Sequence, residues 1–166
     1  MSIDVAIMMG SKSDLEIMRP AARVLTGLGL KVEVRVLSAH RTPAEAAAFV
    51  RDAGARGCKV FICGAGGAAH LAGAVAAHTT RPVIGVPIGA GSLGGIDSLL
   101  STVMMPPGMP VATVAVGGAE NAGLLAAQII AVGDAALAAR VEGERDARRQ
   151  KVLASDAEVR AEFAGG

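Results

Sequence analysis

Aromatic side chains are nearly absent from this chain, which contains three phenylalanines and neither tyrosine nor tryptophan. Proteins that bind single-stranded nucleic acid stack the bases on aromatic side chains, so the composition argues against that function. The net charge of +1 gives no general attraction to DNA, RNA or a membrane surface. With 52% hydrophobic and 19% charged residues, the chain also lacks the composition of a disordered protein. We expect a compact soluble domain.

Cysteine is scarce as well. Cys58 and Cys63 fall in one predicted strand, where five steps of about 3.3 Å hold their backbones roughly 16 Å apart. That separation excludes a disulfide between them, and free thiols favour a reducing compartment. The first residues show neither the basic region nor the cleavage pattern of a signal peptide. We therefore expect a cytoplasmic protein.

Charge is unevenly distributed along the chain. Between residues 60 and 119 the only charged side chains are Arg81 and Asp97, whereas the part after Arg140 is densely charged. A stretch so poor in charge cannot easily cover itself with a soluble surface in a small monomer, so we expect other subunits to bury part of it. The alternative is a central sheet shielded by its own helices.

Short apolar runs alternate with segments of helical periodicity. Most of the runs are continuous, which is typical of parallel strands buried on both faces. The predicted strands are Ile3–Met9, Lys31–Leu37, Cys58–Cys63, Val83–Val86 and Val111–Val116. The predicted helices are Asp14–Leu28, Pro43–Arg56, Ala68–His78, Ile96–Met105 and Glu120–Val141.

This alternation predicts a three-layer α/β/α fold with a five-stranded parallel sheet. Only the run from Lys31 to Leu37 alternates between apolar and charged residues, which indicates an edge strand and favours the flavodoxin-like order 2-1-3-4-5. The 166 residues suit a single domain. We expect a core over residues 1–140 and a charged tail of one or two solvated helices over residues 141–166.

Two helix signals refine these bounds. Thr42 is expected to cap the helix that begins at Pro43, and Glu45 to complete a capping box. Pro20 falls inside the first predicted helix, which is therefore either kinked or begins later.

Ligands of such a sheet bind beyond the carboxyl ends of its strands. The first of these loops, Gly10-Ser-Lys-Ser-Asp14, joins a strand to a helix start, where free N–H groups favour an anion. The hydroxyls of Ser11 and Ser13 can bind phosphate or sugar oxygens, and Asp14 can accept a hydrogen bond from a sugar hydroxyl. A simple N-cap made by Ser13 or Asp14 explains the same residues equally well.

The loop from Ser38 to Pro43 places His40 beside Arg41 after the second strand. Arginine can bind phosphate in a bidentate manner, and histidine can move protons near neutral pH. The alternatives are a surface ion pair for Arg41 and a hydrogen-bonded loop histidine for His40. Their adjacency at the end of a strand favours a functional site.

A glycine-rich loop, Gly64-Ala-Gly-Gly-Ala-Ala69, follows the third strand. It matches the dinucleotide pattern G-x-G-x-x-A, but it follows the wrong strand and no acid lies about twenty residues on. Its glycines either bring the backbone close to a flat ring or a carboxylate, or allow tight packing of helix on sheet. His70 is either a second site residue or a support of the loop, and His78 is expected to be structural.

Several chemistries are set aside. The chain shows no zinc-ligand spacing, no Walker lysine motif and no nucleophile elbow. A phosphoacceptor domain needs acids after two strands, and a flavin site needs aromatic side chains in these loops. We therefore expect none of these particular chemistries.

Together the loops closely resemble class I N5-carboxyaminoimidazole ribonucleotide mutases, the PurE family of purine biosynthesis. The matching motifs occur in order between Val5 and Ala131. They are Met9–Asp14, Ser38–Pro43, Gly64–Leu71, Pro82–Pro87, Asp97–Ser101, Met105–Pro106 and Asn121–Gln128.

The resemblance implies an isomerase without cofactor or metal that moves a carboxylate from N5 of an imidazole ribonucleotide to ring carbon C4. Carbon dioxide would be released, trapped and recaptured, with His40 shuttling the proton. It also implies a cytoplasmic homo-octamer. Composition and net charge already predict that the protein binds neither nucleic acid nor membrane. The substrate-binding residues implied by the resemblance and the loops are Ser11, Ser13, Asp14, Ser38, Arg41, Gly64, Ala65, Gly66, Gly67, His70 and Leu71.

Two other functions stay open. Class II relatives carboxylate the ring directly with carbon dioxide, but they usually carry lysine after the histidine and lack the glycine loop. Arg41 and the intact loop favour class I. A non-catalytic nucleotide-binding module of flavodoxin type is the other alternative.

Overall fold

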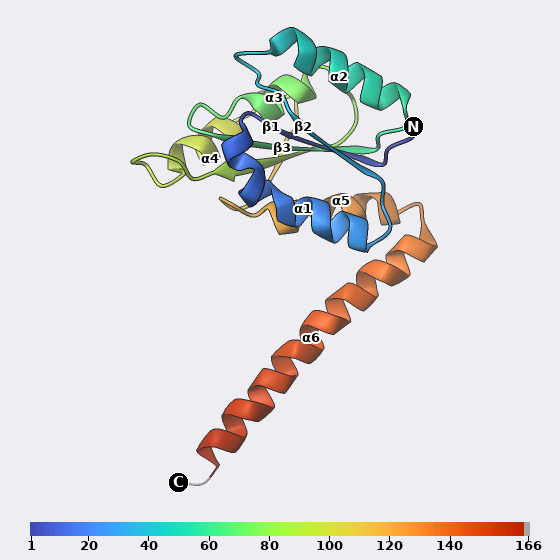
Figure 1. Ribbon diagram of the computed structural model, residues 1–166, viewed down its shortest axis with the longest axis vertical. Helices are drawn as coiled ribbons and strands as arrows, with labels where there is room; N and C mark the ends of the chain where they lie inside the picture. The colour runs from blue at the N-terminus through green and yellow to red at the C-terminus, as the bar shows by residue number, and fades with distance from the viewer. Residues whose placement is uncertain (165–166) are drawn as a thin grey trace.

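The computed structural model describes residues 1–164 as an α/β core from which one long helix projects (Figure 1). The strands are β1 (Val5–Met9), β2 (Val32–Val36), β3 (Val60–Gly66), β4 (Val83–Ile88) and β5 (Ala112–Thr113). The helices are α1 (Leu15–Gly27), α2 (Pro43–Ala55), α3 (Leu71–Ala76), α4 (Ile96–Val103), α5 (Ala119–Ala131) and α6 (Ala135–Phe163), and a 3-10 turn, η1 (Lys12–Asp14), precedes α1.

The sheet has five parallel strands in the order β2-β1-β3-β4-β5, which confirms the predicted topology. Helices α1 and α5 pack on one face of the sheet and α2 and α3 on the other (Figure 1). The residues of β1 and β4 are all buried, because both strands are covered on two faces. The layers are therefore α/β/α.

The fifth strand is shorter than predicted. Only Ala112 and Thr113 pair with β4, although the sequence from Val111 to Val116 is apolar throughout. Pro87 in β4 faces the segment that follows β5, and its carbonyl accepts a hydrogen bond from the backbone N–H of Gly117. Its ring nitrogen carries no hydrogen, so Pro87 cannot donate a ladder bond on that side, and regular pairing is limited to Ala112 and Thr113.

The predicted helix Glu120–Val141 is wrong, because the chain breaks into α5 and α6. Asp134 adopts an extended conformation and its carboxylate accepts a hydrogen bond from the backbone N–H of Leu137 at 2.9 Å. This N-cap starts a new helix. The predicted tail, residues 141–166, lies as far as Phe163 in this single helix of 29 residues, and residues 165–166 are outside the described part of the chain. The predicted helix Ala68–His78 is also shorter, since α3 covers only Leu71–Ala76.

The predicted cap of α2 is wrong as well. The Thr42 hydroxyl makes no capping bond; it accepts from the backbone N–H of Ser38 at 2.8 Å and donates to the carbonyl of Ser38. Pro20 lies inside α1, which begins at Leu15 and runs past it.

Cys58 and Cys63 are free and buried, as predicted. Burial raises the pKa of both thiols, which keeps them protonated. No helix within residues 1–164 is long and apolar enough to cross a membrane.

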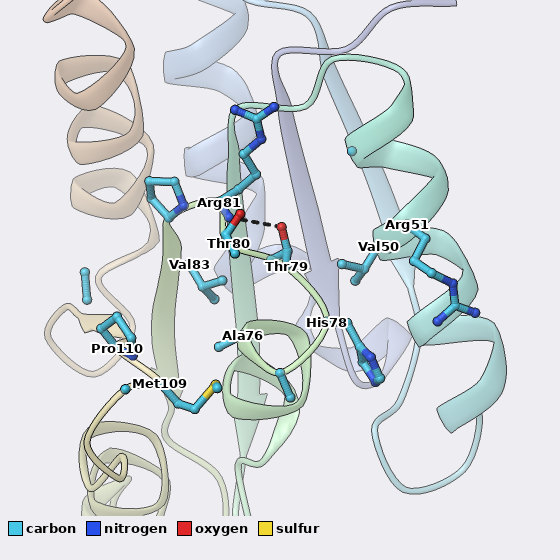
Figure 2. Close-up of a pocket in the computed structure, with 15 residues that line it drawn as sticks. Val50, Arg51, Ala76, His78, Thr79, Thr80, Arg81, Val83, Met109 and Pro110 are labelled. Carbon is cyan, nitrogen blue, oxygen red and sulfur yellow. Dashed lines mark hydrogen bonds between the residues drawn. The ribbon is translucent and has the colours of Figure 1, made fainter.

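The amino edge of the sheet carries a cleft of about 970 Å³, between α2, the loop before β4 and the segment before β5 (Figure 2). The residues drawn there include Arg51 on α2, Arg81 before β4 and Met109 before β5. This amino-edge cleft lies at the opposite end of the strands from the predicted site.

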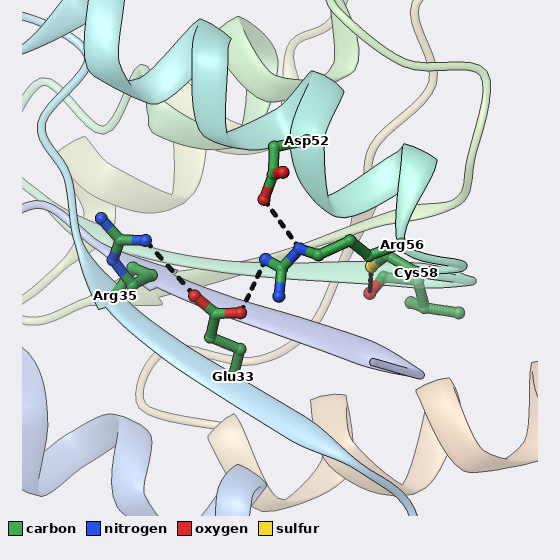
Figure 3. A network of polar contacts seen from close by, with 6 residues as sticks. Glu33, Arg35, Asp52, Arg56 and Cys58 are labelled. Carbon is green, nitrogen blue, oxygen red and sulfur yellow. Dashed lines mark hydrogen bonds and ion pairs between the residues drawn. The ribbon is translucent and has the colours of Figure 1, made fainter. Parts of the chain in front are cut away.

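The exposed edge strand β2 is held by an ion-pair network (Figure 3). Glu33 pairs with Arg56 at 2.7 Å and with Arg35 at 3.3 Å, and Arg56 also contacts Asp52 at 2.7 Å. The guanidinium of Arg35 lies over the ring of Phe49, 4.8 Å from its centroid. These contacts fasten β2 to α2 and confirm the edge position predicted from the alternation.

Candidate functional site

The loops that follow β1, β2 and β3 meet at the carboxyl edge of the sheet. They enclose a cavity of about 350 Å³, which Ala90, after β4, also lines. The predicted site residues found in its wall are Ser11, Asp14, Ser38, His40, Arg41, Ala65, Gly66, His70 and Leu71. Three predicted residues, Ser13, Gly64 and Gly67, lie outside it. Gly10, Ala39, Ala68 and Ala90 were missed, because small apolar residues in a loop carry no chemical signal.

The Ser11 loop is held by a capping box. The Ser11 hydroxyl accepts from the backbone N–H of Ser13 at 3.3 Å, and the Asp14 carboxylate accepts from the backbone N–H of Ser11 at 3.1 Å. The Ser13 hydroxyl donates to Ser11 and Asp14 within the same loop. The cap is therefore made by Ser11, while Ser11 and Asp14 also face the cavity.

The Ser38 loop is held by the Ser38 hydroxyl, which accepts from the backbone N–H groups of His40 and Arg41 at 3.3 and 3.2 Å. Hydroxyl-to-backbone bonds of this kind are typical of turns. Arg41 reaches across to the first loop and donates to the carbonyl of Gly10 at 2.6 Å. The guanidinium has five N–H donors, so this bond leaves donors for an anion in the cavity.

His40 and His70 are in direct contact. Nε2 of His40 lies 2.8 Å from Nδ1 of His70, and the rings meet at 81° with centroids 4.9 Å apart. In a neutral pair one of these nitrogens donates and the other accepts, so each ring fixes the tautomer of its neighbour. Both rings are exposed, so His40 keeps its Nδ1 edge available for a ligand proton.

The three glycines of the third loop have different roles. A Cβ on Gly64 would overlap the side chain of Met18, so Gly64 serves helix–sheet packing. Gly67 has φ +60°, which permits the turn after β3. A Cβ on Gly66 would lie 3.2 Å from the carbonyl oxygen of Ile88 and 3.3 Å from Ala90, inside the cavity wall. Of the three, only Gly66 lines the cavity, and a Cβ there would crowd the cavity wall.

Metal chemistry has no obvious ligand set here. Within residues 1–164 no three histidine, cysteine or acidic side chains are grouped closely enough to hold an ion. The cavity instead offers hydroxyls, a guanidinium, backbone N–H groups at the η1 turn and an imidazole pair. The fold is that of a flavodoxin-like α/β protein, and the donors that line this cavity are of the kinds that bind a small, hydroxylated anion.

Comparison with known proteins narrows this class. The family model described as AIR carboxylase matches residues 4–151. An N5-carboxyaminoimidazole ribonucleotide mutase of Brucella melitensis is 54% identical, over 92% of this chain and 95% of its own length. One of Mycobacterium tuberculosis is 52% identical, over 93% and 89%. The crystal structure of Treponema denticola PurE2-S38D has a TM-score of 0.87 at 30% identity, covering 95% of this chain and 98% of its own.

The chain therefore belongs to the AIR carboxylase family. Its curated relatives are mutases, and the chain is an enzyme of that isomerase class. This confirms the family resemblance seen in the loop motifs.

Proposed function

We propose that the chain is an N5-carboxyaminoimidazole ribonucleotide mutase of purine biosynthesis. It converts N5-CAIR into 4-carboxy-5-aminoimidazole ribonucleotide (CAIR). The N5–carboxyl bond breaks and the C4–carboxyl bond forms. N5 gains a proton, and C4 loses one. The identity of more than half its residues with curated mutases supports this reaction. The structural observation that carries it is the contact of His40 with His70 on a cavity that also holds Arg41.

His40 is the general acid and base of this proposal. As an imidazolium it protonates N5 while carbon dioxide leaves, and as an imidazole it then accepts the proton from C4. One imidazole is enough, because His40 first gives up a ring proton to N5 and then regains a proton from C4 within the same turnover. General acid–base catalysis of this kind contributes about 10²–10⁴-fold to a rate.

His70 positions the ring of His40 and does not take the proton itself. Its Nδ1 contact at 2.8 Å fixes the tautomer of His40, and an asparagine amide can donate or accept at the same place. We expect His40→Asn to bind nucleotide but to lose about 10²–10⁴-fold in kcat. His70→Asn, the matched control, is expected to lose less than about tenfold, the value of one neutral hydrogen bond. Equal losses in both variants would contradict these roles.

The other predicted site residues hold the substrate, and among them Ser13, Gly64 and Gly67 belong to the surrounding loops and do not line the cavity. Arg41 binds the phosphate, with Ser11, Ser13 and Ser38 as hydroxyl donors, and Asp14 accepts from the ribose. The Gly64–Gly67 loop, with Ala65, His70 and Leu71, surrounds the ring and the migrating carboxylate. Small side chains here let the backbone close around carbon dioxide and exclude water. The reaction needs neither a metal nor a cofactor.

We also propose that the protein works in the cytoplasm as a homo-oligomer, an octamer by resemblance to the family. An apolar surface on α4 and its approach loop, the α4 face, supports self-association. Its residues are 45–77% exposed and comprise Leu93, Ile96, Leu100, Val103 and Met104. A chain with few charges between residues 60 and 119 cannot leave such a surface in water without a cost in solubility. Sedimentation velocity tests the assembly, and a monomer would contradict it.

The decisive assay mixes the pure protein with N5-CAIR and follows the appearance of CAIR. A direct carboxylase is the main competitor, since the family model carries that description. It would ignore N5-CAIR and instead consume aminoimidazole ribonucleotide with bicarbonate or carbon dioxide. A non-catalytic module would bind the nucleotide without exchanging solvent deuterium into C4. Either result would overturn the mutase assignment.

A further inference from the structure

The amino-edge cleft has the size and lining of a small-molecule site, although the proposed reaction makes no use of it. It encloses about 970 Å³, against about 350 Å³ for the cavity at the carboxyl edge. Ligand sites are concave and mostly apolar, with a few polar groups that orient the ligand. Val83, Pro110 and Met109, which is 42% exposed, supply apolar surface here. The cleft is therefore suited to hold an organic molecule.

Two arginines flank this cleft. Arg51 stands on α2 and Arg81 on the loop before β4 (Figure 2). None of the residues that line the cleft is acidic, and neither arginine forms an ion pair within residues 1–164. By contrast, Arg19, Arg56 and Arg148 are paired with carboxylates of the same chain. The cleft thus presents two positive charges without an internal counter-ion.

The loop before β4 adds further groups that bind phosphate. Arg81 is one of only two charged residues between residues 60 and 119. Its backbone N–H donates to the hydroxyl of Thr79 at 3.1 Å, a bond that fixes the turn on which Arg81 stands. The hydroxyl of Thr80 and the imidazole of His78 belong to the same wall. Guanidinium, hydroxyl and imidazole groups are all donors to phosphate oxygens.

We propose that the amino-edge cleft binds an organic phosphate, a molecule with a planar or apolar body and one or more phosphate groups. The phosphates bind Arg51 and Arg81, and the body lies against Val83, Met109 and Pro110. This site is at the opposite end of the strands from the cavity at the carboxyl edge. Its existence does not rest on the reaction proposed above, but its effect on turnover does.

The two helices beside the cleft also connect it to the reaction site. α2 begins directly after the loop that carries His40, and α3 begins directly after His70. The side chains between the two helices are small, chiefly alanine and valine, and leave a hollow of about 60 Å³. This hollow gives the helices room to move against each other. A ligand that draws Arg51 toward Arg81 shifts α2 relative to α3 and disturbs the contact of His40 with His70. Occupancy of the cleft is therefore expected to lower kcat.

Calorimetry with ADP tests the site. ADP joins a flat base to a diphosphate, and adenosine and inorganic pyrophosphate serve as probes of its two parts. The titrations use the full-length Arg41→Ala variant, in which binding at the carboxyl edge is weakened. ADP is expected to bind more tightly than either part, and less tightly as the salt concentration rises. Absence of ADP binding would overturn the proposal, and so would equal binding of adenosine, because the phosphates would then make no contact.

Variants made in the same background locate the binding. Arg51→Gln with Arg81→Gln should weaken ADP binding at least about tenfold, through the loss of charged hydrogen bonds. Arg23→Gln with Arg160→Gln is the matched control, since both arginines lack an ion pair and lie outside the cleft. Gly54→Leu narrows the cleft without a change of charge, and a Cβ at Gly54 meets nothing within 4 Å. This variant should also weaken ADP binding. An equal loss in the control pair would indicate unspecific attraction and overturn the site.

Steady-state turnover of N5-CAIR, with and without ADP, tests the effect on the reaction site. In the wild type, saturating ADP should lower kcat about two- to tenfold, the value of one neutral hydrogen bond. Arg51→Gln with Arg81→Gln should keep the basal kcat and lose this response. An unchanged kcat with ADP bound, or a rise in KM alone, would overturn the link between the sites. Absence of any turnover would overturn the reaction and the link together, while calorimetry still decides the site.

Discussion

Gly123 offers a sharp test of how tightly α5 packs on α1. A Cβ at this position would overlap Cγ1 of Val24 and lie 3.0 Å from the carbonyl oxygen and 3.1 Å from the Cα of Ala21. Two of these three atoms belong to the backbone, so the helices must separate to admit a methyl group. Gly123 is fully surrounded within the core cluster that joins α1, α5 and the sheet.

The magnitude follows from two opposing contributions to the free energy of unfolding. Alanine is favoured over glycine inside a helix by about 1 kcal/mol. Overpacking a close-packed core costs typically about 1–3 kcal/mol, and the upper part of that range applies where backbone has to move. The expected net effect of Gly123→Ala is a loss of about 1–2 kcal/mol, or a Tm lower by roughly 2–8 °C for a chain of this size.

Gly143→Ala is the matched control. It makes the same substitution in a helix, but nothing lies within 4 Å of the added Cβ. Only the propensity gain remains, so this variant should equal or exceed the wild type in stability, by up to about 1 kcal/mol. Thermal unfolding followed by circular dichroism, at one protein concentration for all three proteins, measures both. A Gly123→Ala variant as stable as Gly143→Ala would refute the packing argument.

Two further outcomes are expected. Arg41→Ala should raise the KM for the nucleotide about 10–100-fold, the value of a charged hydrogen bond, with a smaller effect on kcat; an unchanged KM in steady-state assays would mean that the phosphate binds elsewhere. Partial burial opposes ionisation of Asp4, but the backbone N–H of Lys31 and the ammonium of Lys59 outweigh it and lower its pKa. The ionised Asp4 therefore stabilises the fold by about 1 kcal/mol at neutral pH, and this contribution is lost as the pH falls from about 4 through the lowered pKa. Asp4→Asn should remove this part of the acid dependence of stability, as measured by thermal melts at pH 3–7. An unchanged pH dependence in the variant would contradict the assignment.

The topology could be predicted because its signals are local. The alternation from Lys31 to Leu37 marks one edge of the sheet, and continuous apolar runs mark the buried strands. The position of the site loops could then be predicted too, because parallel strands bring their carboxyl ends to one edge of the sheet. The break between α5 and α6 was missed because helical periodicity continues across it. Only the capping geometry of Asp134 reveals it.

Within the site, residue types were predictable but contacts were not. His40 and His70 lie thirty residues apart in sequence, and no sequence pattern shows that Nε2 of His40 lies 2.8 Å from Nδ1 of His70. The capping box made by Ser11 was missed in favour of one at Thr42, because both segments carry an acid three residues after a hydroxyl. The hydroxyl of Thr42 is instead engaged by Ser38, a choice that depends on how the loop turns.

The charged fastening of β2 limits how copies of this chain can join. An edge strand with free backbone groups invites a neighbouring strand to extend the sheet, but side chains tied down over β2 by Arg56 and Asp52 obstruct that approach. The opposite edge is only two residues long. Extension of the sheet from one copy to the next is therefore disfavoured at both edge strands. Contacts between copies are left to helical surfaces, which can form a closed assembly with a fixed number of subunits.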